Sequence, residues 1–133
     1  GTGPNWGELV LKDGGTVILF AQCKDGVSDE HPEVLKNGYL PLNKVKDLVE
    51  KGEIKDLAAA SHICHGGEKL YKKNIRCILV SEGVSREEAR QLGLEYARTP
   101  QEAVDMAMKR YGENVRIYAY PGHTYAELII ETG

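Results

Sequence analysis

Short apolar runs alternate along the chain with longer segments that have the periodicity of helices. Thr16–Ala21 and Ile75–Val80 are apolar or β-branched at most positions, which is typical of strands covered on both faces of a parallel sheet. Val115–Tyr120 repeats this character more weakly. These runs are predicted to be central strands, and Leu94–Ala97 and Glu127–Ile130 are predicted to be a short fourth strand and a terminal or edge strand.

Capping residues identify the starts of two helices. Ser85 and Glu88 have the spacing of a capping box, in which each side chain accepts a hydrogen bond from the backbone amide of the other residue. Thr99 precedes a proline at the first helical position, where the missing N–H costs nothing. This second helix is predicted to end near Gly112.

Two further helices are expected in the middle of the chain. Asn43 is predicted to cap a helix that ends at Gly52, and Ser61 to cap another that fades by Asn74. Helices of this length between strands imply right-handed crossovers. The sequence therefore predicts a three-layer α/β domain of the Rossmann or flavodoxin-like type, with a mostly parallel sheet flanked by helices.

The beginning of the chain predicts a helix that is only partly present. Trp6–Leu11, followed by a glycine pair, is typical of the last turn of a helix and its stop signal. We interpret residues 1–8 as a short non-native leader plus the remnant of this helix, and residues 9–133 as a single domain. A chain of 133 residues is long enough for one substantial hydrophobic core but not for two independent ones.

Composition limits the partners and the compartment. The formal net charge is -3 and the lysines are scattered among acidic residues, so nucleic acid is not expected as a partner. The longest apolar runs are about five residues, whereas a membrane-spanning helix needs about 20, so no membrane partner is expected either. The 3 cysteines lack the spacing of a zinc site or a disulfide framework, which favours reduced thiols in a cytoplasmic protein.

Side chains that follow the predicted strands are candidates for a binding site. Ligands of open α/β sheets bind beyond the carboxyl ends of the strands. Gln22, Cys23 and Asp25 follow the first strand, Ser81–Gly83 follows the second, and His123 follows the third. A thiol beside a lysine can be activated, but a cysteine at a strand end is also an ordinary small buried residue, and the sequence leaves both interpretations open.

The predicted helix start at Ser61 carries the most visible chemistry. His62 and His65 are three residues apart and would face one side of a helix, where they could share a metal ion, although spacing fixes no third ligand. The alternative is a polar helix start with one capping and one solvated histidine. Gly66 and Gly67 cost about 1–2 kcal/mol relative to alanine inside a helix. They indicate either a close approach by a ligand or partner domain, or a simple break in the helix.

Several short motifs occur in a characteristic order along the chain. They are Leu11–Leu19 with Gln22–Gly26, His62, Leu79–Ser85 with Glu87–Ala89, Leu92–Gly93 and Thr99–Ala103. In this order they resemble the C-terminal domain of the nickel-dependent lactate racemase family. The similarity covers roughly residues 9–130 and depends on ordered short motifs rather than on one diagnostic signature.

The resemblance implies a two-domain enzyme that inverts the carbinol carbon of a 2-hydroxy acid. In this family a nickel pincer nucleotide accepts hydride from that carbon and returns it to the opposite face. The general-base histidines and the lysine that tethers the cofactor belong to the N-terminal domain, so the resemblance assigns no catalytic residue and no cofactor to this chain. A substrate-binding Tyr-Gln-x-x-Lys motif precedes the glycine pair in the family, and this chain begins too late to contain it. The implied partners are the N-terminal catalytic domain and a small 2-hydroxy acid.

By position, the resemblance places Ser61–Gly67 at the border of the interdomain cleft. This sequence has His65 and Gly66 where relatives often carry glutamine or a bulky aromatic residue, which leaves the hydroxy acid open among lactate, malate and sugar acids. A rival interpretation is a free-standing flavodoxin-like module, with binding or regulatory function, that recognises a small anion at the strand ends.

Overall fold

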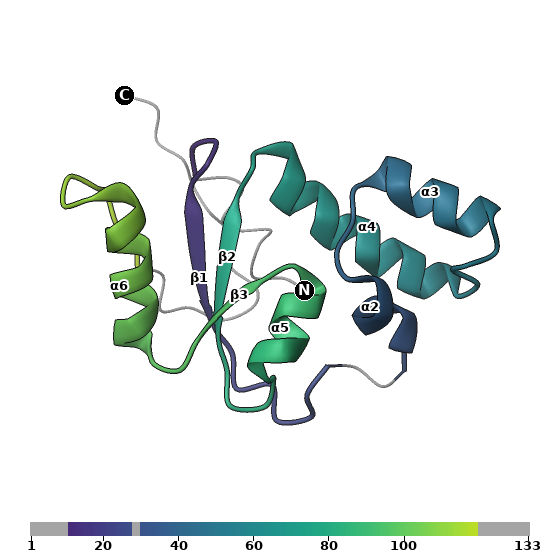
Figure 1. Ribbon diagram of the computed structural model, residues 1–133, viewed down its shortest axis with the longest axis horizontal. Helices are drawn as coiled ribbons and strands as arrows, with labels where there is room; N and C mark the ends of the chain where they lie inside the picture. The colour runs from purple at the N-terminus through teal and green to yellow at the C-terminus, as the bar shows by residue number, and fades with distance from the viewer. Residues whose placement is uncertain (1–10, 28–29, 120–133) are drawn as a thin grey trace.

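A parallel β-sheet forms the centre of the computed structural model, which describes residues 11–27 and 30–119. Strands β1 (Thr16–Phe20), β2 (Arg76–Val80) and β3 (Glu95–Ala97) lie in the order β1-β2-β3, and each pairs in parallel with the next (Figure 1). The three strands expected in these regions of the sequence are confirmed.

Helix α6 (Pro100–Tyr111) covers one face of the sheet. Ile18 and Ile78 are opposite each other in register, and both pack in the same core as Ala103 of α6. Thr99 caps this helix by accepting a hydrogen bond from the amide of Glu102 at 3.1 Å, as its sequence predicts. The alternation of side chains along a strand sends the neighbouring residues to the opposite face.

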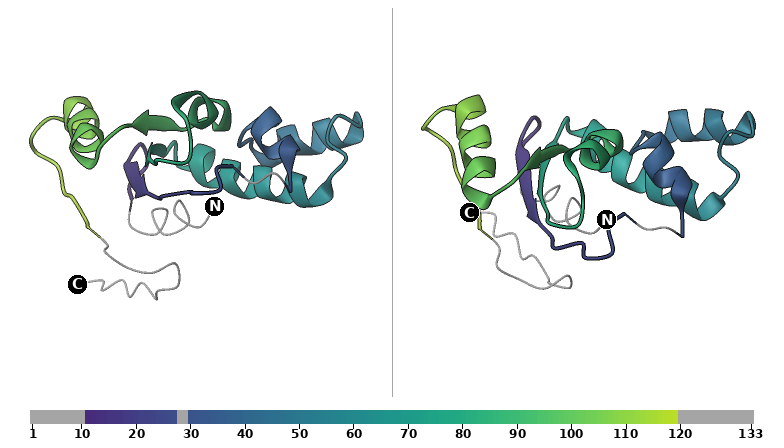
Figure 2. Two further views of the ribbon diagram at one scale, coloured as in Figure 1. Left: turned by 90° about the horizontal axis from the view of Figure 1, so that it is seen from below. Right: turned by 60° about the horizontal axis from the view of Figure 1, so that its bottom comes forward.

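Helices α4 (Leu57–Lys72) and α5 (Arg86–Leu92) cover that opposite face. Cys77 packs with Leu70 of α4, and Leu79 packs with Ala89 of α5. The capping box predicted at the start of α5 is present with both of its hydrogen bonds. Figure 2 shows α6 on one side of the sheet and α4 and α5 on the other, so the predicted three-layer α/β arrangement is confirmed.

A second, purely helical core lies beyond the sheet. Helices α2 (Pro32–Asn37) and α3 (Leu42–Glu50) pack against the N-terminal part of α4 (Figure 1). The buried residues of this core include Val45 of α3 and Ile63 of α4. Because Leu70 of α4 belongs to the sheet core, this single long helix connects the two cores.

Two predicted caps are wrong. Pro41, not Asn43, precedes the first residue of α3, and Asn43 lies inside the helix. Asp56, not Ser61, caps α4, and its carboxylate accepts a hydrogen bond from the amide of Ala58 at 2.9 Å. Aspartate caps as well as serine does, and the alanines that follow it are strong helix formers, so the cap of α4 lies five residues before the expected cap at Ser61.

The strand predicted at 115–120 is also not observed. Residues 115–119 form neither a strand nor a helix, and Ile117 and Tyr118 are each 69% exposed. An apolar pattern forms a strand only where a neighbouring strand and a buried face are available, and within the described residues this segment has neither. The remnant helix at 6–10, the strand at 127–130 and His123 lie outside the described residues. No helix in the part of the chain that the structure describes is both long enough and apolar enough to span a bilayer.

Candidate functional site

The loops that follow β1 and β2 lie against each other at the carboxyl edge of the sheet. The carbonyl of Gln22 accepts hydrogen bonds from the amide of Gly83 at 3.0 Å and from the hydroxyl of Ser81 at 3.2 Å. A Cβ atom at Gly83 would be 1.7 Å from the carbonyl oxygen of Cys23, so only glycine permits this approach. The structure therefore brings together two of the loops that the sequence indicated.

The candidate side chains in these loops differ in exposure. Gln22 and Asp25 are exposed, whereas Cys23 is half-buried and packs near Leu79 and Val84 in the core beneath α5. Cys23 also has a φ of 47°, a left-handed conformation that is uncommon outside glycine. These apolar neighbours favour the interpretation of Cys23 as an ordinary small core residue over that of an activated thiol.

Backbone amides at this edge are already paired within the chain. In addition to the bond from Gly83, the amide of Gly26 donates to the carbonyl of Cys23 at 2.7 Å, and the amide of Val84 donates to the hydroxyl of Ser81 at 3.3 Å. An anion site at strand ends depends on amides that point outward without partners. These three amides do not provide one.

On α4, the glycine pair fits against a segment of the same chain. A Cβ atom at Gly66 would be 2.3 Å from Cδ1 of Tyr39, and one at Gly67 would be 1.9 Å from the carbonyl oxygen of Leu40. The close approach inferred from the sequence is therefore present. The segment that approaches the glycines is residues 39–40 of the same chain, not a ligand or a partner domain, and no local sequence pattern indicates it.

The histidines of α4 are paired differently from the sequence expectation. Ser61, His62 and His65 are all exposed, and the ring of His62 faces His31, with centroids 5.3 Å apart and an angle of 41° between the ring planes. His31 immediately precedes α2, and α2 packs against α4. His31 was missed because it lies 31 positions before His62 and no spacing rule connects them; its only local signal is the proline that follows it and starts a helix.

His31 is held by a carboxylate. Its Nδ1 is 2.7 Å from Oδ2 of Asp56, the residue that caps α4. This hydrogen bond is the main cause that lowers the pKa of Asp56, with smaller contributions from the backbone amides of Ala59 and Ala58. Across residues 11–27 and 30–119, no three His, Cys, Asp or Glu side chains gather as a complete metal site would require.

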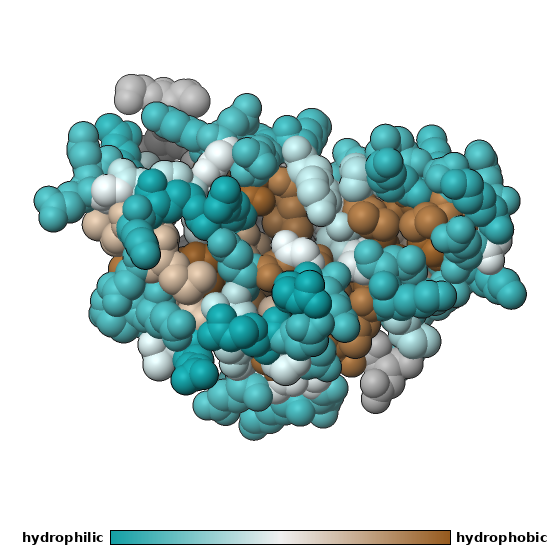
Figure 3. All heavy atoms as spheres, viewed as in Figure 1, coloured by the Kyte–Doolittle hydropathy of each residue, from teal (hydrophilic) through white to brown (hydrophobic). Residues whose placement is uncertain are grey.

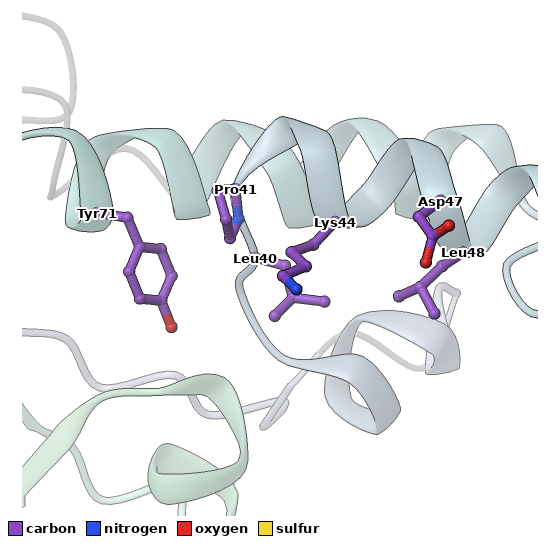
Figure 4. Close-up of a pocket in the computed structure, with 6 residues that line it drawn as sticks. All are labelled: Leu40, Pro41, Lys44, Asp47, Leu48 and Tyr71. Carbon is purple, nitrogen blue, oxygen red and sulfur yellow. The ribbon is translucent and has the colours of Figure 1, made fainter.

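An apolar groove of about 360 Å³ opens between α3 and the C-terminal turns of α4. Figure 4 shows Lys44, Asp47 and Leu48 of α3 on one side of it and Tyr71 of α4 on the other. Exposed apolar atoms are visible in this region in Figure 3. The groove contains none of the residues that the sequence singled out, so it is separate from the candidate site.

Comparison with known proteins now identifies the family. A family model for the lactate racemase C-terminal domain matches residues 3–124 of this chain, which is nearly its whole length. No curated protein and no solved structure gave a significant match. The described residues of the matched region form a parallel sheet packed between helices. The chain belongs to the lactate racemase C-terminal domain family.

Proposed function

We propose that this chain is the C-terminal, substrate-closing domain of a two-domain, nickel-dependent racemase or epimerase of 2-hydroxy acids. The observation that carries the proposal is the family match over residues 3–124. The reaction inverts the carbinol carbon by removing hydride and returning it to the other face. A domain that closes over such a reaction excludes water and orients the substrate carboxylate.

The donor side chains in residues 11–27 and 30–119 do not form a site that fits the nickel cofactor. The described residues contain no cluster of three metal-ligating side chains. Burial raises the pKa of the Cys77 thiol to about 12, so this thiol stays protonated and is a poor ligand at neutral pH. We therefore assign the cofactor to the neighbouring N-terminal domain, and we assign no chemical step to the residues of this chain.

Two groups of side chains are proposed to line the cleft. The first is at the strand ends, where Gln22 and Asp25 are exposed beside Cys23. The second is the exposed surface of α4. Its members are Ser61, His62, His65 and the adjoining Gly66. His123 stays a proposal from sequence position, since it lies outside the described residues.

Racemisation by the joined domains tests the proposal. The chain is expressed alone and fused to the N-terminal domain of its parent enzyme, loaded with the nickel cofactor, and each protein is incubated with one enantiomer of lactate and of malate. Chiral chromatography is expected to show inversion by the fused protein only, because the proposal assigns the cofactor to the N-terminal domain. Inversion by the chain alone, or none by the loaded fusion on any 2-hydroxy acid, would contradict the proposal.

Side-chain variants of the fusion test the cleft assignment. Asp25→Ala and His65→Ala are expected to lower kcat/KM, since both residues are proposed to contact the closed cleft. Lys109→Ala is the matched control, because Lys109 is an exposed residue of α6 on the opposite face of the sheet. Equal activity in all three variants would remove these residues from the cleft while leaving the racemase assignment itself intact.

The rival small-anion module predicts a different result. It requires the chain alone to bind an anion such as phosphate or sulfate at the strand ends. The internal pairing of the amides of Gly26, Gly83 and Val84 argues against this function. Saturable phosphate binding by the isolated chain, weakened by Gln22→Ala, would favour the module.

A further inference from the structure

The pairing of His31 with His62 joins two imidazoles from separate segments, one just before α2 and one on α4. We propose that these two imidazoles form a binding site for a divalent transition-metal ion of the Zn²⁺ type, with water completing the coordination. The inference uses only contacts within this chain and can be tested on the chain alone, although His62 is also one of the residues proposed to line the cleft.

The separation of the rings is the first argument. Two imidazoles bound through nitrogen to one tetrahedral Zn²⁺, at Zn–N distances of about 2.0–2.1 Å, have ring centroids roughly 5 Å apart. The observed centroid distance between His31 and His62 is 5.3 Å, with the planes tilted by 41° rather than stacked. The centroid separation therefore matches that of two imidazoles sharing one ion.

The orientation of His31 is the second argument. The hydrogen bond between Nδ1 and Asp56 occupies one ring nitrogen, so Nε2 is the nitrogen of His31 that would bind a metal ion. Ligand histidines in metal sites usually make this bond to a carboxylate through the nitrogen that does not bind the metal. The bond to Asp56 thus orients the His31 ring in the way that is usual for a ligand histidine.

The support of Asp56 is the third argument. One carboxylate oxygen of Asp56 accepts from the amide of Ala58 while the other bonds His31. The amide of Asp56 in turn donates to the carboxylate of Glu33 on α2, at 3.1 Å. These bonds fix the carboxylate relative to both helices, so the position of His31 is set before any ion binds.

The chemistry of the donors selects the ion. Imidazole nitrogen suits Zn²⁺, Ni²⁺ and Cu²⁺, whereas Mg²⁺ and Ca²⁺ prefer oxygen ligands. The carboxylate oxygens of Asp56 and Glu33 already accept hydrogen bonds, those of Glu33 from the amides of Lys55 and Asp56. The site is therefore expected to bind Zn²⁺ and to ignore Mg²⁺.

Calorimetric titration of the metal-free chain with Zn²⁺ tests the proposal. One Zn²⁺ per chain is expected, and binding should be lost or weakened at least about tenfold in His31→Gln and in His62→Gln, since each variant removes one of the two ligands. His65→Gln is the matched control, because His65 is an exposed histidine on the same helix, and its affinity should equal that of the native chain. Mg²⁺ should give no heat of binding.

A third variant separates support from ligation. Asp56→Asn keeps a good helix cap but removes the carboxylate, and loss of such a supporting carboxylate typically weakens metal affinity about 10- to 100-fold. Circular dichroism in EDTA checks that every variant is folded. An unchanged affinity in His31→Gln or His62→Gln, or an equal loss in His65→Gln, would overturn the proposal and leave the two rings as an aromatic contact.

Discussion

Replacing Gly67 by alanine should destabilise the domain, although the same change stabilises an ordinary helix. The added Cβ atom would lie 1.9 Å from the carbonyl oxygen of Leu40 and 2.1 Å from its carbonyl carbon. Those are backbone atoms, which cannot rotate away as a side chain can. The segment is also held on both sides, because the amide of Leu40 donates to Ile63 at 3.3 Å and that of Tyr39 to Leu92 at 3.1 Å.

The magnitude follows from three opposing terms. Alanine gains about 1 kcal/mol over glycine in helix propensity. Overpacking of a filled site costs typically about 1–3 kcal/mol. Moving residues 39–40 away would also weaken backbone hydrogen bonds worth roughly 0.5–1.5 kcal/mol each. The net expectation for Gly67→Ala is a loss of about 1–3 kcal/mol in the free energy of unfolding.

Urea denaturation followed by circular dichroism measures this loss. The midpoint should fall at an unchanged m value, as expected when stability changes without a change in the exposed surface. The difference between His65→Ala and His65→Gly is the control, since His65 is exposed one turn or less away and reports helix propensity alone. A Gly67→Ala protein that is as stable as the native chain, or more stable, would refute the packing argument.

Four further outcomes can be checked on the same chain. Ile78→Ala should cost about 2–5 kcal/mol in urea denaturation, because Ile78 is fully buried between β1 and β3. Ser85→Ala should cost about 0.5–2 kcal/mol through loss of the capping box, and a cost near zero would argue against that cap. Cys77, whose pKa is raised to about 12 by burial, should resist alkylation at pH 8 until the protein unfolds, as mass spectrometry can show. The hydrogen bond to His31 is the main reason why the pKa of Asp56 in the folded protein lies below its ordinary value of 3.8. The ionised Asp56 carboxylate therefore stabilises the fold above pH 3.8, and this stabilisation is lost as the pH falls below that value. Asp56→Asn should make the free energy of unfolding less dependent on pH in this acid range, and an unchanged dependence would contradict the role of Asp56.

Gly66 illustrates how the structure alters an expectation based on sequence. If Gly66 bordered an open cleft, Gly66→Leu would lower the turnover of the enzyme and leave the stability of the domain unchanged. The ring of Tyr39 occupies the space that any side chain at Gly66 would need. We therefore expect Gly66→Leu to lower the urea midpoint of the isolated domain, so loss of turnover in that variant would not identify a cleft residue.

The elements that the sequence predicted correctly depend on local chemistry. β1 and β2 are continuous apolar runs, and the caps at Ser85 and Thr99 lie within three residues of their bonding partners. α2 was missed because it is 6 residues long and contains no fully buried residue, so it has no clear apolar period. A local sequence pattern is sufficient to predict an element that has a clear apolar period or a capping residue. α2 has no clear apolar period and no side-chain cap.

The remaining differences come from contacts between distant segments. Whether the apolar run predicted as a strand at 115–120 forms one depends on a neighbouring strand with which it can pair. The partner of His62 is His31 rather than His65, because the packing of α2 on α4 decides which rings meet. The strand-end loops were located correctly by topology alone, since parallel strands end at a common edge.

The placement of Ile63 and Leu70 on one helix has a consequence for how the molecule opens. Ile63 belongs to the helical core and Leu70 to the core beneath the sheet, and both residues lie on the continuous helix α4. We therefore expect the two cores to unfold together, so that under native conditions the amide protons of β2 and α3 are protected from exchange by similar free energies.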